Sequence, residues 1–143
     1  MINIRMWHKD LIPVLPREQL VAQWQELSAA AGNILTKGTP NHILINKIMD
    51  YPLDHFITYA KFVREEMTKR GYRTMNRVWD KIVSVHPKWH TINCNSLFDQ
   101  WMDYEYLKIC YYNLLEKYLC DGIEFVNWQK INNLYYKKIK EIS

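Results

Sequence analysis

Apolar residues recur at helical spacing along most of this chain. After Pro16 they are separated by four, three and four positions, which is the period of an α-helix with one buried face; they are Leu20, Trp24, Leu27 and Ala31. Pro16 suits the first turn, where its missing N–H costs nothing. Gly32 is expected to end this helix in a left-handed conformation.

Further apolar stripes with start and stop signals follow. Thr39-Pro40 leads into a short helix, and a longer one carries Phe56 to Met67 and should end at the Lys69-Arg70-Gly71 turn. Three more helices are predicted near residues 76–85, from 104 to Asp121-Gly122, and from a cap at Asn127 onward. No run alternates as a half-buried strand would. The pattern predicts an all-α fold, a single compact domain of about five to six helices over residues 1–143.

Composition narrows the class of protein. The chain has 143 residues, 48% of them hydrophobic, and no apolar run near the roughly 20 residues that span a bilayer. The first residues lack a secretory pattern, so we expect a cytoplasmic monomer with no membrane contact. Three cysteines without CxxC spacing, Cys94, Cys110 and Cys120, are expected to be small core residues.

Positive charge is concentrated in one segment. The whole chain has a formal net charge of +4. Residues 61–88 contain eight basic and three acidic side chains, an excess of five that exceeds the total for the chain. Such a zone favours a polyanionic partner, nucleic acid first. The alternative is a solvated helix face without a partner.

Most common catalytic motifs are absent from the sequence. His86 and His90 flank a proline and have no nearby cysteine or carboxylate in sequence to complete a zinc site. There is no Gly-rich nucleotide loop and no GxSxG. We therefore expect no metal and no cofactor. Among the tryptophans, three on apolar stripes are predicted to be core and three others are candidates to stack on bases: Trp24, Trp79 and Trp128 for the core, and Trp7, Trp89 and Trp101 for stacking.

Glu26 lies in the middle of the first predicted helix, at the edge of its apolar stripe. The segment LVAQWQELSAAAG around it resembles the first helix of pyrimidine-dimer DNA glycosylases of the phage endonuclease V type, with its Leu-x-Ala-x-aromatic-x-Glu-Leu pattern. A second segment, DHFITYAKFVREEMTKRGY, resembles a later helix of that family, from His55 to Lys-Arg-Gly-aromatic. The amino-terminal IRMWHKDLIPVLP is also similar to bacterial relatives. The resemblance covers roughly the first half of the chain.

The resemblance implies a compact all-α repair enzyme that acts on damaged double-stranded DNA. In that family the amino-terminal amine attacks the sugar C1′ after base extrusion, and a glutamate assists β-elimination. The corresponding catalytic groups here are the Met1 α-amine and Glu26. The nucleic-acid-binding residues expected on the same basis and from the basic zone are Arg5, Gln25, Lys69, Arg70, Arg73 and Arg77.

The chain departs from the family pattern at two positions. Active members have arginines immediately before and three residues after the glutamate, where this chain has Gln25 and Ala29. A lysine nucleophile, or no lyase activity, is the alternative to the Met1 amine. Two further functions stay open: a non-catalytic nucleic-acid-binding domain that kept this fold, and a small helical protein-interaction domain.

Overall fold

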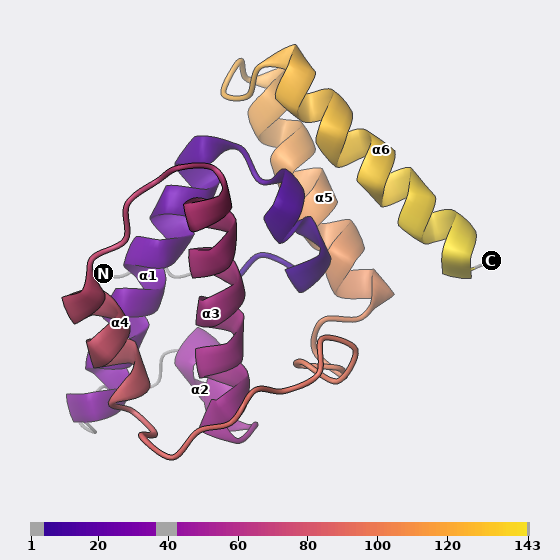
Figure 1. The fold of residues 1–143 in the computed structure, drawn as a ribbon. Helices are drawn as coiled ribbons and strands as arrows, with labels where there is room; N and C mark the ends of the chain where they lie inside the picture. Colours follow the sequence, from indigo (N-terminus) through magenta and orange to yellow (C-terminus); the bar gives the residue numbers. More distant parts are fainter. Residues whose placement is uncertain (1–4, 37–42, 143) are drawn as a thin grey trace.

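The computed structural model describes residues 5–36 and 43–142, and these form helices connected by loops without a strand (Figure 1). Met1 lies outside the described residues, as does the helix start predicted at Thr39-Pro40. The described part contains six α-helices, as the sequence predicted, and a short 3-10 helix, η1, which it did not predict: η1 Lys9–Val14, α1 Arg17–Thr36, α2 Ile43–Met49, α3 Leu53–Lys69, α4 Asn76–Val83, α5 Tyr104–Leu119 and α6 Phe125–Ile142.

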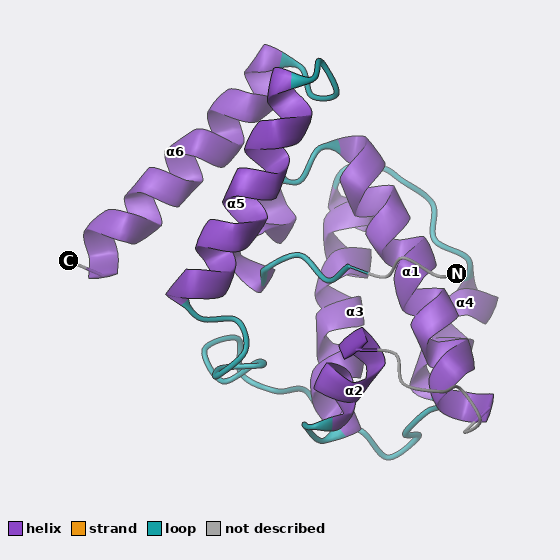
Figure 2. Ribbon diagram, turned by 180° about the vertical axis from the view of Figure 1, so that it is seen from behind, coloured by secondary structure: helices purple, strands orange, loops and turns teal. Residues whose placement is uncertain are grey.

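The helices form two packed groups joined by η1. Helix α1 packs against α3 and α4, and α2 lies on α3. Helices α5 and α6 form an antiparallel hairpin, and η1 contacts both α3 and α6 (Figure 2). The buried stripe of α1 is the predicted one, with Leu20, Leu27 and Ala31 fully buried and Trp24 6% exposed. No helix among the described residues is long and apolar enough to cross a membrane.

Of the two helix ends predicted at a glycine, the structure confirms one and contradicts the other. Helix α3 ends as expected, because Gly71 adopts a φ of 82° and the Tyr72 amide donates to the Met67 carbonyl at 2.8 Å. The prediction for Gly32 is wrong: α1 continues through it to Thr36. The side chain of Lys81 passes over Gly32, whose missing Cβ leaves room for the Lys81 ammonium.

Two other expectations about helix ends and cysteines also fail. Asn127 is not the cap of the last helix, which begins two residues earlier, at Phe125; the Trp128 amide already donates to the Glu124 carbonyl at 2.9 Å. Of the cysteines only Cys110 is buried, whereas Cys94 and Cys120 are exposed in loops or at a helix end.

Candidate active site

Glu26 meets the amino-terminal segment directly. Its Oε2 accepts a hydrogen bond from the backbone N–H of Arg5 at 2.7 Å. The side chain is half-buried, at the edge of the apolar stripe as predicted. Burial raises the pKa of the Glu26 carboxyl, while the Arg5 N–H and the Arg5 charge oppose that rise. A carboxyl group with a raised pKa at the surface of a domain can exchange protons closer to neutral pH than an ordinary one.

Gln23, one helical turn before Glu26, holds the same segment. Its Nε2 donates to the Arg5 carbonyl at 2.7 Å, and its Oε1 accepts from the Trp7 N–H at 2.8 Å. The side chain is completely buried. Because both bonds go to backbone groups, Gln23 fixes the path of residues 5–7 whatever their side chains are.

Two tyrosines complete the fixation of this segment. The buried Tyr59 hydroxyl, from α3, donates to the Trp7 carbonyl at 2.6 Å and lies 3.0 Å from Gln23 Oε1. Burial raises the pKa of Tyr59 far above its usual range, so the hydroxyl keeps its proton and remains a donor. The Tyr106 hydroxyl, from α5, donates to the Met6 carbonyl. Sequence reasoning missed Gln23, Tyr59 and Tyr106, because an apolar stripe does not reveal which buried polar groups face a distant segment.

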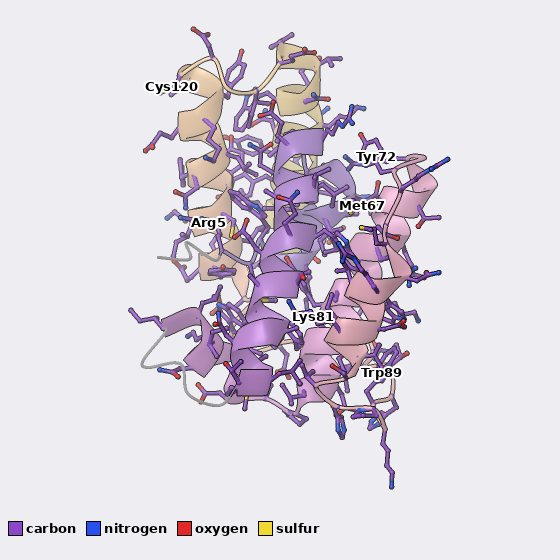
Figure 3. All side chains as sticks on the ribbon, turned by 90° about the vertical axis from the view of Figure 1, so that its left-hand side faces the viewer. Arg5, Met67, Tyr72, Lys81, Trp89 and Cys120 are labelled. Atoms are coloured by element: carbon purple, nitrogen blue, oxygen red, sulfur yellow. The ribbon has the colours of Figure 1, made fainter. Side chains whose placement is uncertain are left out.

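The predicted nucleic-acid contacts fall into exposed and internally bonded groups. Five of the six predicted contacts are exposed residues, namely Arg5, Gln25, Lys69, Arg73 and Arg77. The Arg5 guanidinium lies over the Trp7 ring, 5.4 Å from its centroid. Figure 3 shows the face with Arg5 beside α1 and Lys81 between α1 and α4. There the Lys81 Nζ lies 3.4 Å from the Ser28 hydroxyl. Cationic side chains on an exposed face of this kind suit a phosphate backbone.

Arg70 is engaged within the protein. Its Nη1 donates to the Leu15 carbonyl at 2.7 Å and its Nη2 to the Pro13 carbonyl at 3.0 Å. Its Nε pairs with Glu66 at 2.7 Å, one turn earlier on α3. These bonds tie the end of α3 to the loop between η1 and α1. A phosphate contact by Arg70 stays a prediction.

The tryptophans differ from expectation at three positions. Trp7 is 4% and Trp101 is 7% exposed, so both belong to the core and neither presents a ring to a base. Trp79, predicted as core, is only half-buried and meets Trp89 edge-on at 5.9 Å, with Arg64 over the Trp79 ring. Trp89 therefore keeps the partial exposure that stacking requires.

Three side chains in the first two turns of α3 hold the long loop between α4 and α5. The Asp54 carboxylate accepts from the His90 backbone N–H at 2.9 Å and from its ring at 2.9 Å, with His86 at 3.4 Å. Bonding to His90 lowers the pKa of Asp54. Thr58 accepts from the Ile92 N–H and His55 from the Phe98 N–H, both at 3.0 Å. The histidines of the HPKWH segment thus have a structural partner.

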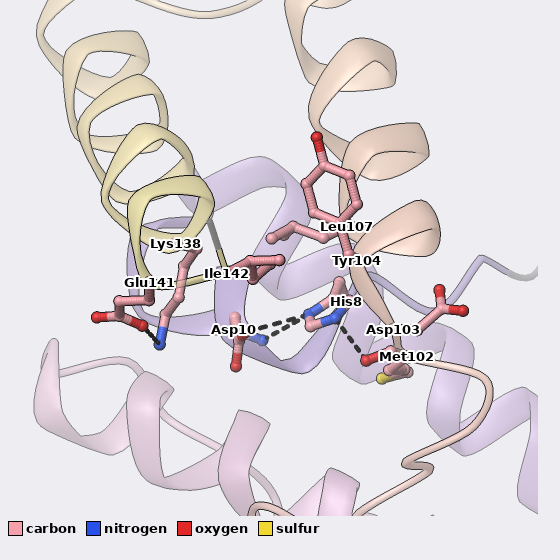
Figure 4. Close-up of a pocket in the computed structure, with 9 residues that line it drawn as sticks. All are labelled: His8, Asp10, Met102, Asp103, Tyr104, Leu107, Lys138, Glu141 and Ile142. Atoms are coloured by element: carbon pink, nitrogen blue, oxygen red, sulfur yellow. Dashed lines mark hydrogen bonds and ion pairs between the residues drawn. The ribbon is translucent and has the colours of Figure 1, made fainter.

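A pocket of about 200 Å³ opens between η1, α5 and α6 (Figure 4). His8 lies at its base, with Nε2 bonded to the Met102 carbonyl at 2.8 Å and Nδ1 accepting from the Asp10 N–H at 3.1 Å. Lys138 and Glu141 pair at 3.6 Å at its rim. Since both ring nitrogens of His8 are bonded internally, this histidine caps η1 and is not presented to a ligand. Across the described ranges no cluster of side chains suited to a metal ion is present.

These features define an all-α protein with a half-buried carboxylate beside a basic, exposed face. Residues 4–80 match the family described as pyrimidine dimer DNA glycosylase. The match covers more than half of the chain, and the protein belongs to this family of DNA repair glycosylases. Comparison with curated proteins and with solved structures found no match. The matched region contains Glu26, Gln23 and Tyr59, whereas α5 and α6 lie beyond it.

Proposed function

We propose that this protein is a DNA N-glycosylase with abasic-site lyase activity on damaged double-stranded DNA. The observation that carries the proposal is the 2.7 Å bond from the Arg5 backbone N–H to the Glu26 carboxylate. It brings the amino-terminal segment against a carboxyl group with a raised pKa. Membership of the family supports the same chemistry.

The proposed reaction uses an amine as nucleophile. The neutral Met1 α-amine attacks C1′ of the damaged nucleotide, the bond from C1′ to the base breaks, and the base leaves with a proton. The attached nitrogen loses one proton, and its lone pair then opens the sugar ring: the C1′–O4′ bond breaks as the C1′=N bond forms, and O4′ takes up a proton. The product is a protonated Schiff base. Removal of a C2′ proton then expels the 3′ phosphate, and water hydrolyses the imine. An α-amine has an ordinary pKa of about 7.7–8.0, which leaves a useful neutral fraction near pH 7.

Glu26 would act as the acid and base of this sequence. Its carboxylate can stabilise the developing positive charge at C1′, and its raised pKa suits proton transfer. Three residues lie between Met1 and Arg5, so the two backbone nitrogens are four residue lengths apart, at most about 14 Å. The covalent geometry therefore allows the amine to reach the carboxyl group of Glu26.

DNA would be held by the exposed cationic residues. We assign phosphate contacts to Arg5, Lys69, Arg73 and Arg77, with Gln25 next to Glu26 as an uncharged contact and Arg70 as the residue that anchors the adjoining loop. Extruding a base costs a few kcal/mol, which phosphate contacts and stacking must offset. Trp89, half-buried and edge-on to Trp79, is the tryptophan that we assign to that stacking.

Borohydride trapping on an oligonucleotide with an abasic site tests the proposal. The expected result is a covalent adduct that maps, after protease digestion, to the Met1 peptide and disappears when the α-amine is acetylated. Glu26→Gln should lower strand cleavage at least 100-fold in keeping with the usual contribution of acid–base catalysis, with DNA binding retained. Glu18→Gln is the matched control, an exposed carboxylate in the first turn of the same helix. An adduct on a lysine would reassign the nucleophile.

The uncharged Gln25 favours one second candidate, a nucleic-acid-binding domain without catalysis. An arginine at this position would add a phosphate contact beside Glu26, and this chain lacks it. No adduct together with salt-sensitive DNA binding would select this function. Absence of both would leave a protein-interaction domain.

A further inference from the structure

Helix α5 contacts the amino-terminal segment of the candidate active site through the side chain of Tyr106. The Tyr106 hydroxyl, on the first turn of α5, donates to the Met6 carbonyl. Its ring is fixed by Trp101, with centroids 5.6 Å apart, and by His8 at 6.3 Å. Residue 106 lies outside the region that matches the family, so the family match assigns it no role.

Residues 5–7 receive one donor at each of three successive carbonyls. Gln23 of α1 donates to the Arg5 carbonyl, and Tyr59 of α3 donates to the Trp7 carbonyl. Tyr106 supplies the middle bond from a third element. Met6 is completely buried, so water has no access to replace a lost donor at this carbonyl. In Figure 2 the segment runs from η1, next to α5, toward α1.

We propose that Tyr106 is a positioning residue, and that the α5–α6 hairpin completes the site by holding the Met6 carbonyl so that the Arg5 N–H stays on Glu26. The catalytic purpose of holding the Arg5 N–H on Glu26 rests on the proposed function. The hydrogen-bonding geometry does not depend on that function. Loss of the Tyr106 bond leaves the Met6 carbonyl without a partner, and the segment then relaxes away from Glu26.

The test compares Tyr106→Phe with Tyr112→Phe, an exposed tyrosine on the same helix. NMR titration of the Glu26 carboxyl carbon is the first readout. The Arg5 N–H lowers the pKa of Glu26, so its displacement in Tyr106→Phe should raise that pKa above the wild-type value. Tyr112→Phe should titrate as the wild type does.

The second readout is the rate of borohydride trapping against pH. Tyr106→Phe should trap about 5- to 30-fold more slowly, the factor that one or two kcal/mol represents. The acidic limb of its rate–pH profile should move to higher pH, because the pKa of Glu26 is raised in this variant. The concentration of DNA at half-maximal rate should stay the same, because the exposed arginines are intact. A purely structural role would lower the amount of folded protein without moving the Glu26 titration.

The outcomes separate this inference from the proposed function. If the wild type gives no adduct, the lyase proposal fails, and the Glu26 titration still decides the role of Tyr106. A folded Tyr106→Phe protein with unchanged Glu26 titration would overturn the inference. Should Tyr106→Phe fail to fold, 4-aminophenylalanine at position 106 provides a para N–H donor. We expect a wild-type Glu26 titration from it, and a shifted titration in that folded protein would count against Tyr106 as a donor.

Discussion

The Tyr59 hydroxyl of α3 lies 3.0 Å from the Gln23 amide oxygen of α1, and both side chains hold the backbone at Trp7. Two helices and the amino-terminal segment therefore meet at one buried polar cluster. Buried polar groups of this kind are costly when one partner is removed, because the remaining donors and acceptors cannot return to water. The cluster links the stability of the core to the placement of the segment against Glu26.

Gln23→Leu should strongly destabilise the protein. It removes the partner of the Trp7 N–H and of the Arg5 carbonyl and puts an apolar side chain of similar size in their place. We expect a loss of about 2–4 kcal/mol in the free energy of unfolding, measured by urea denaturation. Gln25→Leu is the control, since the same residue type on the same helix is exposed two positions later. A loss at position 23 no larger than at 25 would show that the hydrogen bonds are not needed.

The two glycines that sequence analysis treated alike should respond oppositely to alanine. At Gly32 the backbone is helical, and an added Cβ meets only the flexible end of Lys81, at 3.3 Å. Gly32→Ala should therefore stabilise the protein by about 0.5–1 kcal/mol. Gly71 has a φ of 82°, so Gly71→Ala should cost about 1–2 kcal/mol. Thermal unfolding of both variants checks the signs, and a stabilised Gly71→Ala protein would contradict the structure.

These glycines also show what the sequence could and could not predict. Spacing of apolar residues predicted the helices, because burial of one face dictates a 3.6-residue period. The stop at Gly71 was predictable because cations and a glycine coincide at the end of α3. At Gly32 the helix continues, and the end of the Lys81 side chain from α4 lies over the glycine, a tertiary contact that no local pattern contains.

In the candidate site, the sequence predicted Glu26 but not the distant residues that it and its neighbours contact. Glu26 stands out because a carboxylate at the edge of an apolar stripe is unusual, and its family context gives it a role. Its partner at Arg5 is 21 residues away, and Tyr106 is 100 residues from the Met6 carbonyl that it binds. Contacts across such separations depend on how the helices pack. Trp7 and Trp101 were misjudged for the same reason, since short loop segments have no periodicity to reveal burial.

Stability should fall as the pH is lowered below about 6.5, the ordinary histidine value. His55 accepts a hydrogen bond from the Phe98 N–H through Nδ1, and burial lowers its pKa. Asp99 and Asp54 oppose this shift, and Lys9 adds to it. A lowered pKa means that the unfolded chain binds a proton first, so the contribution of His55 is present above 6.5 and is lost between 6.5 and its folded value.

The His55→Gln variant isolates this contribution. Glutamine does not titrate, so the free energy of unfolding of the variant should depend less steeply on pH between 6.5 and 5 than that of the wild type. Urea denaturation at several pH values measures the difference. His8 also has a pKa lowered by burial, and it should account for part of the dependence that remains. Equal slopes in the two proteins would exclude His55 as a source.

Arg77 and Arg70 should separate DNA contact from structural support. Arg77 is exposed on α4, so Arg77→Ala should weaken DNA binding and reduce the slope of log affinity against log salt by about 0.9 if it neutralises one phosphate. Its free energy of unfolding should change by less than about 0.5 kcal/mol.

Arg70→Ala removes donors from the Leu15 and Pro13 carbonyls, so it should cost about 1–3 kcal/mol of stability. Fluorescence anisotropy with a labelled duplex at several salt concentrations, beside urea denaturation, measures both quantities. A salt slope unchanged in Arg77→Ala would remove this arginine from the binding face, and a reduced slope in a stable Arg70→Ala protein would make Arg70 a phosphate contact after all.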